Sequence, residues 1–135
     1  MKKYRHWCAI SFSASYGEFY SNPLYYAKNI YLNNTLVTDL VIPSGVTSIG
    51  NYAFNFCSSL TSITIPSSVT SIGGSAFRIC SNLTSATFKT TSGWWRSTSS
   101  TATSGTSLSS IDLANTSTAA TYLTSTYSDY YWKRS

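Results

Sequence analysis

The sequence offers few side chains that could perform acid–base or nucleophilic chemistry. His6 is the single histidine and Cys8 lies two residues after it, so a reactive thiol–imidazole pair can be imagined there. Such a pair needs a third group to orient it, and an incidental histidine near a free thiol is the favoured interpretation. There is no glycine-rich phosphate loop and no Cys-x-x-Cys or Cys/His metal spacing, so we expect a non-enzymatic protein with no cofactor and no metal. The carboxylates are too scattered to form the pair that cleaves glycosidic bonds: they are Glu18, Asp39, Asp112 and Asp129.

Aromatic side chains are better material for binding. Trp94, Trp95 and Arg96 are consecutive, and two indoles beside a guanidinium could stack on sugar rings or form the hot spot of a protein interface. The favoured alternative is structural, with one ring closing the end of the fold and the other partly exposed. Trp132 is open to the same two interpretations. These four residues are the candidate ligand or interface contacts.

Composition and charge exclude several classes of partner. The 135 residues include 42% hydrophobic and 10% charged side chains, which is enough apolar material for one folded domain. The net charge of +5 comes from cations that are widely spaced or lie at the chain ends, not gathered as in a nucleic-acid-binding protein. No apolar run approaches the roughly 20 residues of a membrane helix. We therefore expect no nucleic-acid partner and no membrane span.

An internal repeat occupies the middle of the chain. Residues 40–62 read LVIPSGVTSIGNYAFNFCSSLTS and residues 63–85 read ITIPSSVTSIGGSAFRICSNLTS, with 15 of 23 positions identical and no gap. A third unit begins at Ala86 and then departs from the pattern, whereas Val37 and Leu40 indicate an earlier, divergent unit. Repeats of this length are typical of proteins whose units stack on one another, because one unit alone cannot bury its apolar face.

Each unit combines two short strands with a compact apolar turn. Residues 63–65 alternate between apolar and polar, which predicts a half-buried strand that ends at the following proline. A second short strand is expected over 69–72. The spacing of Ala76, Phe77 and Cys80 predicts a single helical turn.

Stacked units should place equivalent residues about 4.8 Å apart, so that like side chains form ladders. Cys57 then lies over Cys80, within reach of a disulfide. Buried free thiols are favoured, because the side chains of a parallel ladder point the same way. The outward residues of the main strands form a short hydroxyl-rich face: Asp39, Val41, Ser62, Thr64, Ser85 and Thr87. The predicted repeat core consists of Ile42, Val46, Ile49, Phe54, Cys57, Leu60, Ile63, Ile65, Val69, Ile72, Phe77, Cys80 and Leu83.

The unit I-P-x-x-V-T-S-I-G-x-x-A-F-x-x-C-x-x-L-x-S resembles the BspA-like leucine-rich repeats of surface proteins from host-associated bacteria and some anaerobic protists. The resemblance covers about residues 36–88. It implies a right-handed solenoid and a role in adhesion or surface recognition. The expected fold is therefore mainly β with short helical turns, a right-handed leucine-rich-repeat solenoid of about three to four coils with an aromatic-rich N-terminal cap and a C-terminal helix.

Four segments of one domain are expected. Residues 1–35 form an N-terminal capping region, and residues 36–90 hold the repeats. Residues 91–112 form a Trp-containing, Ser/Thr-rich linker, since 97–110 contain eleven Ser or Thr in fourteen positions. Residues 113–135 form a capping helix, with Asn115 as its N-cap and an apolar face that runs to about residue 127.

Three functions remain open from the sequence. The favoured one is an extracellular or cell-surface recognition module that binds a protein or glycan ligand. The alternative is a structural subunit of a phage tail, appendage or filament that packs against copies of itself through its ends and aromatic flanks. The third is a repeat fragment without a ligand of its own. The basic start and weakly apolar stretch over 7–14 resemble a secretory signal only superficially, so a cleaved signal is not favoured.

Overall fold

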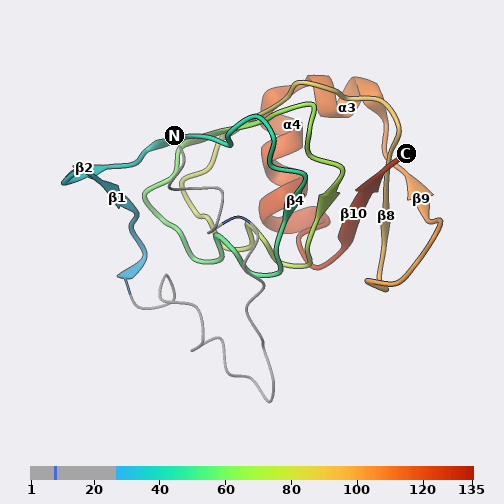
Figure 1. Cartoon of the computed structure of the whole chain (residues 1–135), viewed down its shortest axis with the longest axis horizontal. Coiled ribbons are helices and arrows are strands. Elements are labelled where there is room, and N and C mark those ends of the chain that lie inside the picture. Colours follow the sequence, from blue (N-terminus) through green and yellow to red (C-terminus); the bar gives the residue numbers. More distant parts are fainter. Residues whose placement is uncertain (1–7, 9–26) are drawn as a thin grey trace, which may run out of the picture.

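The computed structural model describes Cys8 and residues 27–135 (Figure 1). Predictions for His6 and for most of the aromatic cap over 1–35 concern residues outside this part. The described residues form mainly strands with few helices, in agreement with the expected class. No helix among them is long and apolar enough to cross a membrane.

The main strands of the repeat form a parallel sheet whose register equals the repeat length. β3 (Asp39–Val41), β5 (Ser62–Ile65) and β7 (Ser85–Phe88) lie side by side in that order. Leu40 pairs with Ile63, one repeat further along the chain, and both side chains are buried. The alternate residues of these strands are half-buried or exposed, so one face of the sheet covers the core.

A second sheet of five strands begins with the other short strand of each unit. β4 (Ser48–Ile49) and β6 (Ser71–Ile72) are parallel neighbours. β10 (Tyr131–Arg134), β8 (Trp94–Ser97) and β9 (Thr106–Ser107) continue the sheet in that order, all antiparallel. The sheet thus joins repeat strands to strands that lie outside the repeat.

The helical turn predicted from Ala76, Phe77 and Cys80 is wrong. These residues lie in successive turns that also contain Ser75 and Ile79, whose φ angles of 58° and 59° are left-handed. Every residue of a right-handed helix has a negative φ, so residues with positive φ cannot belong to one, whatever the spacing of the apolar side chains. The three predicted side chains are nevertheless buried.

Hydrogen bonds between units explain this turn conformation. Phe54 N donates to Ala76 O at 2.8 Å, and Phe56 N donates to Arg78 O at 3.0 Å. A helix would have used these groups for bonds within itself. The left-handed residues direct backbone N–H and C=O groups of the turns toward the adjacent unit. Adjacent units are therefore hydrogen-bonded along their turns as well as along their strands.

The core lies between the two sheets and the turns. The rings of Phe54 and Phe77 stack with centroids 5.3 Å apart and an interplanar angle of 8°. Cys57 and Cys80 lie in the same apolar cluster, and so does Cys8. Each of the thirteen predicted repeat-core residues is buried.

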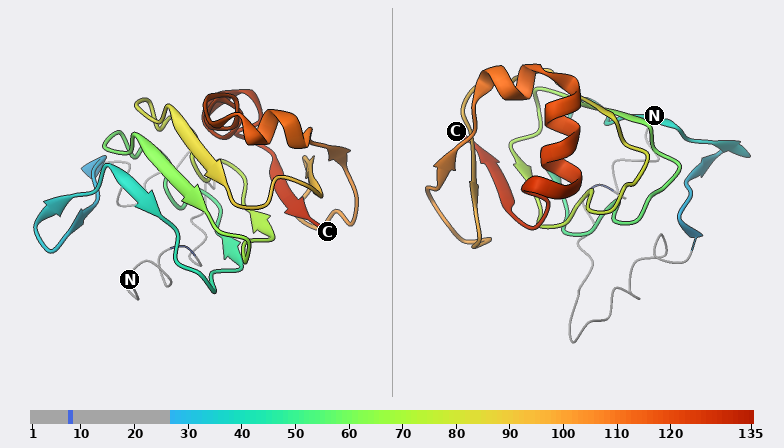
Figure 2. Two further views of the ribbon diagram at one scale, coloured as in Figure 1. Left: turned by 90° about the horizontal axis from the view of Figure 1, so that it is seen from above. Right: turned by 180° about the vertical axis from the view of Figure 1, so that it is seen from behind.

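Three short helical segments cover the C-terminal side of the repeats. α3 (Ser110–Ala114), α4 (Thr116–Thr121) and the π-helix η3 (Tyr122–Thr126) follow one another, and α4 lies beside β7 (Figure 2). Asn115 caps α4 as expected, because its Oδ1 accepts from Thr118 N at 3.1 Å.

The capping helix expected over residues 113–135 ends earlier. Its last turn finishes at Thr126, and residues 131–134 form β10 instead. The physical reason is that β10 finds backbone partners on both sides, β6 and β8. The Ser/Thr-rich segment also differs from the expected linker, since β9 pairs with β8 within it.

This C-terminal region completes the hydrogen bonds of the last unit. Ser75 N donates to Ser128 O at 2.7 Å, and Ile79 N donates to Thr124 O at 3.4 Å. The equivalent amides of the preceding unit donate to the next repeat. Carbonyl groups of a non-repeat segment therefore stand where a further repeat would otherwise lie.

A hairpin precedes the first main strand. β1 (Tyr31–Leu32) and β2 (Thr35–Leu36) are antiparallel and are joined by Asn33 and Asn34. Both asparagines have positive φ, 50° and 63°, as the tight turn of a two-residue hairpin requires. The hairpin lies at the opposite end of the molecule from β8 and β9 (Figures 1 and 2).

Candidate functional site

Two of the four candidate contacts lie in the core. Trp94 and Trp132 are buried, and their rings meet edge to face with centroids 6.4 Å apart. Phe88 packs against both rings. The two indole N–H groups donate to Thr90 O at 2.9 Å and to Tyr127 O at 3.1 Å. These tryptophans therefore fill the C-terminal end of the core.

The other two contacts are half-buried and lie on opposite faces of β8. The guanidinium carbon of Arg96 lies 4.0 Å from the ring centroid of Tyr127 and 4.5 Å from that of Tyr130, so the cation is held between two aromatic faces. Trp95 points to the outer face of the sheet, with Lys133 Nζ 5.6 Å from its ring centroid. Of the four candidates, Trp95 has the outward position.

A row of outward side chains crosses the five-stranded sheet at Trp95. The register pairs Ser48 with Ser71, then Ser71 with Lys133. It continues by pairing Lys133 with Trp95, and Trp95 with Ser107. Residues paired in this way share one face of a sheet. Hydroxyl groups, one ammonium group and one indole are thus arranged across five strands.

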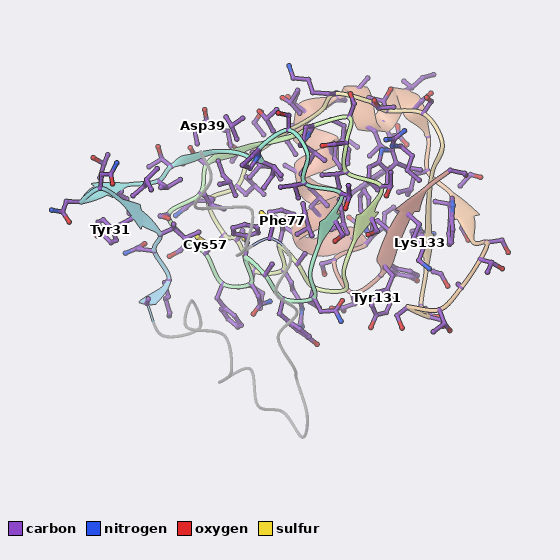
Figure 3. All side chains as sticks on the ribbon, in the orientation of Figure 1. Tyr31, Asp39, Cys57, Phe77, Tyr131 and Lys133 are labelled. Atoms are coloured by element: carbon purple, nitrogen blue, oxygen red, sulfur yellow. The ribbon has the colours of Figure 1, made fainter. Side chains whose placement is uncertain are left out.

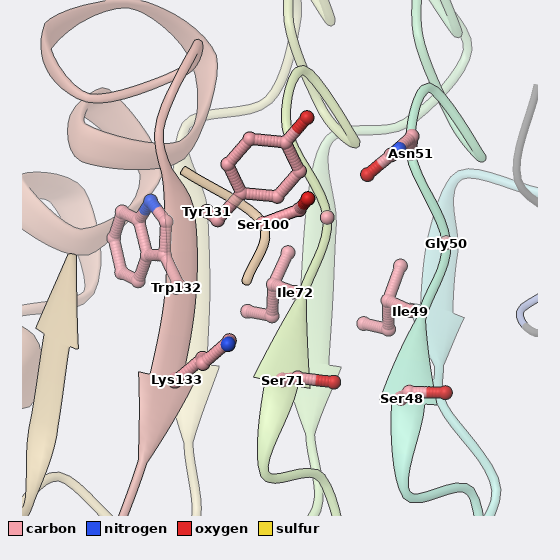
Figure 4. A pocket seen from close by; sticks show the side chains of 11 residues that line it. Ser48, Ile49, Gly50, Asn51, Ser71, Ile72, Ser100, Tyr131, Trp132 and Lys133 are labelled. Atoms are coloured by element: carbon pink, nitrogen blue, oxygen red, sulfur yellow. The ribbon is translucent and has the colours of Figure 1, made fainter. Parts of the chain in front are cut away.

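Part of this row borders a cleft of about 280 Å³ (Figure 4). Strands β4, β6 and β10 contribute most of its walls, and Ser100 enters from the connection between β8 and β9. Its polar lining contains hydroxyl groups, an amide, a phenol and an ammonium group, which belong to Ser48, Asn51, Ser71, Ser100, Tyr131 and Lys133.

Contacts around the cleft hold its walls in place. Lys133 Nζ donates to Ala102 O at 2.6 Å, which ties the β8–β9 connection to β10. Gly74 N donates to Asn51 Oδ1 at 3.0 Å and so joins the ends of β4 and β6. Gly105 packs so closely that a Cβ there would lie 2.7 Å from the ring of Trp95. The ammonium group of Lys133 and the amide of Asn51 are therefore held in place at the cleft.

The lining favours binding chemistry. It combines hydrogen-bond donors and acceptors with an aromatic ring, and no carboxylate, imidazole or thiol is among its residues. In the part of the chain that the structure describes, no three His, Cys, Asp or Glu side chains lie close enough to hold a metal ion. Hydrogen bonding and ring contact are the interactions that this cleft offers.

The cysteines are structural. Cys57 and Cys80 are buried free thiols, which agrees with the favoured prediction. Cys80 Sγ donates to Phe54 O at 3.0 Å. Burial raises the pKa of the Cys57 and Cys80 thiols, with the neighbouring Cys57 adding to the effect at Cys80. Burial also raises the pKa of Cys8 to about 12.

Alkaline pH should destabilise the protein through these thiols. An unfolded thiol ionises near pH 9.0, whereas folded Cys8 keeps its proton up to about 12. The folded state then holds protons that the unfolded state has lost, so each thiol should lower the unfolding free energy by about 1.4 kcal/mol per pH unit above that point. Urea denaturation at about pH 8 and about pH 10.5 measures the loss.

Cys8→Ala is the control for this pH effect, because tyrosines also ionise in the same range. Its unfolding free energy should decline with pH less steeply than that of the unchanged chain, by about 1.4 kcal/mol per pH unit. Equal slopes for the two chains would contradict the assignment to Cys8.

The parallel strands in repeat register define a stacked-repeat protein, and the family is now evident. The family described as BspA type leucine rich repeat region (6 copies) matches residues 24–127, which is most of the chain. This chain belongs to that family, which confirms the resemblance and extends it beyond residues 36–88. Searches of curated proteins and of solved structures gave no match.

The cleft was not among the sites predicted from the sequence. Ser48 and Ser71 occupy the same position of the V-T-S-I-G motif, so the repeat alone could have placed them together. Tyr131 and Lys133 carried no such signal, because β10 does not belong to the repeat. Their place became visible only with the antiparallel register of β10 against β6.

Proposed function

We propose that this chain is a non-enzymatic surface-recognition module that binds a glycan in the cleft between β4, β6, β10 and the β8–β9 connection. The observation that carries the proposal is the set of hydroxyl groups from Ser48, Ser71 and Ser100 beside the phenol of Tyr131 and the ammonium group of Lys133. Membership of the BspA-type repeat family supports a surface-type repeat module without catalytic activity.

The lining suits a polyhydroxylated ligand in particular. Sugar hydroxyls both donate and accept hydrogen bonds, as do serine and tyrosine hydroxyls, so the two sets complement each other. Tyr131 offers a ring for contact with a sugar face, and Trp95 continues the row beyond Lys133. The volume of about 280 Å³ is near the lower end for small-molecule sites, so a short saccharide unit fits best.

The proposal includes an extracellular or cell-surface location and a right-handed solenoid of three to four coils. Repeat pairing from β3 through β7 supports the stacking. In this proposal the residues from 113 onward act as the C-terminal cap. The part of the assembly alternative that relied on Trp94 and Trp132 loses its support, because both rings are buried.

A glycan array followed by calorimetry tests the proposal. The full chain should retain a subset of short host or bacterial saccharides, and the best-retained saccharide becomes the titrant. Tyr131→Ala should weaken its binding about tenfold, which corresponds to about 1.4 kcal/mol. Ser71→Ala should weaken it a few-fold, in line with the loss of about one hydrogen bond.

Ser85→Ala is the matched control, because this serine lies on β7 and outside the cleft. Its affinity for the same saccharide should equal that of the unchanged chain. An empty array, or equal affinity of all three variants, would reject the glycan site.

A further inference from the structure

The outer edge of β3 is an unpaired strand edge within the described residues. Ser62 N donates to Thr38 O and Ile42 N donates to Thr64 O, so the even-numbered residues of this strand face β5. Alternation then turns the N–H and C=O groups of Asp39 and Val41 toward the opposite side. Among the described residues, no backbone group pairs with them there.

The other outer edges of the stacked repeat strands are covered. α4 lies beside β7, and β10 pairs with β6. Next to the outer edge of β4, the first strand of the five-stranded sheet, Gly50 N donates to Cys8 O at 2.7 Å. In the part of the chain that the structure describes, β3 is therefore the main repeat strand that can accept another strand. Figure 2 shows it on the side of its sheet away from the helices.

Apolar side chains surround this edge. Val41 is 44% exposed and Leu36 is 40% exposed. A hollow of about 390 Å³ lies between the β1–β2 hairpin and β3, lined in part by Leu32, Leu36 and Val37. Figure 3 shows Tyr31 and Asp39 far from Tyr131 and Lys133, so this surface is separate from the cleft. The unpaired N–H and C=O groups of an exposed strand edge are a template for pairing with another chain.

We propose that β3 pairs with β3 of a second copy of this chain, antiparallel and across a twofold axis at Leu40. A strand that adds to this edge must itself have an unpaired edge. Among the described residues of a second copy, β1, β2 and β9 also have one, but each has only two residues, whereas β3 has three and carries the exposed Val41. A twofold axis perpendicular to the sheet makes the two strands antiparallel and keeps both cores on the same face of the joined sheet.

The residue pairing supports this register. Centring on Leu40 places Asp39 opposite Val41 of the second copy, and both residues turn their N–H and C=O groups toward the partner strand. Each carboxylate then lies opposite an apolar side chain. Centring on Asp39 would set two like charges against each other, which is destabilising. Centring on Val41 would bring in Pro43, which has no N–H to donate.

Light scattering coupled to size-exclusion chromatography provides the first test. The full chain should pass from a monomer near 14.8 kDa to a species of about twice that mass as its concentration rises. Val41→Pro removes one edge N–H and Val41→Lys places a charge there, and each should weaken dimerisation at least about tenfold. Thr64→Lys is the matched control, because Thr64 pairs with Val41 one strand further in and should leave dimerisation unchanged.

Cross-linking tests the register. Residues directly opposite each other in this arrangement lie about 5.5 Å apart between Cα atoms, within disulfide range. A mixture of Asp39→Cys and Val41→Cys chains should therefore form a cross-linked dimer under mild oxidation, at several times the yield of either variant alone. The native cysteines are buried and do not compete.

Three results would overturn the proposal. They are a monomer at every concentration, a dimer that Val41→Lys and Thr64→Lys affect equally, and cross-linking of either variant alone as efficiently as the mixture. None of them bears on the glycan cleft, which lies on the other sheet.

Discussion

Replacing Phe77 with alanine should lower the free energy of unfolding by about 3–5 kcal/mol. The ring is buried and stacks on Phe54 at 5.3 Å. The surrounding backbone is held on both sides, by Phe54 N donating to Ala76 O and by Ile79 N donating to Thr124 O. The space left by the ring therefore cannot close easily, and the full cost of a cavity is expected. Urea denaturation followed by tryptophan fluorescence and circular dichroism measures the change.

Two variants serve as controls for Phe77→Ala. Phe77→Leu keeps most of the volume and should cost only about 1 kcal/mol. Tyr31→Ala removes an aromatic ring that is 62% exposed and should change stability by less than about 0.5 kcal/mol. A loss below about 1 kcal/mol for Phe77→Ala would contradict the stacked core, and a double-mutant cycle with Phe54→Ala should show coupling of about 0.5–1.5 kcal/mol.

The repeated half of the fold was predictable because identical residues fix the register. Leu40 pairs with Ile63 and Ile49 pairs with Ile72, as the sequence alignment of the units requires. A slip of one residue would turn every apolar side chain of a strand to the other face. Repetition therefore gave both the strands and the stacking order from sequence alone.

The turns were misjudged because spacing alone does not report backbone handedness. Apolar residues at 76, 77 and 80 suit one face of a helix, and they also suit two turns joined by a left-handed residue. Neither Ser75 nor Ile79 is a type that signals positive φ, and a β-branched residue is an outlier there. The deciding factor is long-range, since the turn carbonyls bond to the adjacent unit.

The C-terminal strands were not predictable, because their partners lie far away in sequence. The apolar face at helical spacing runs to about residue 127, so a capping helix was expected over residues 113–135. Pairing with β6 and β8 on both sides outweighs that local preference. The Ser/Thr-rich segment has too little apolar surface to order itself, yet Lys133 binds it through Ala102 O. The candidate cleft depends on both features, so only its two repeat serines could be foreseen.

The two ends of the stack of repeats differ in a way that bears on function. At the C-terminal end, the residues from 124 to 134 complete the hydrogen bonds of the last unit, and β10 also forms one side of the cleft. At the other end the described residues leave the edge of β3 unpaired. Under the two proposals, one end binds a saccharide and the other binds a second copy, so that a dimer through β3 would present two clefts on the same assembly.

Trp132 connects the cap to the repeats, so its removal should have an effect as large as that of Phe77. Its ring is buried, stacks on Phe88 at 6.0 Å and meets Trp94 edge to face. Its N–H donates to Tyr127 O at 3.1 Å, in the segment between η3 and β10. Its strand lies between β6 and β8, so a cavity at this position affects both the repeat and the cap.

We expect Trp132→Ala to lower the free energy of unfolding by about 3–5 kcal/mol, through lost burial and a cavity that β6 and β8 keep open. Trp132→Phe retains a ring but removes the donor to Tyr127 O, and should cost about 1–2 kcal/mol. Denaturant unfolding gives both values. Near-ultraviolet circular dichroism of the folded variants reports whether the packing of Trp94 has changed. If Trp132→Ala unfolded at the same denaturant concentration as the unchanged chain, β10 would not be an integral strand of the sheet, and the cleft that depends on Tyr131 and Lys133 would lose its wall.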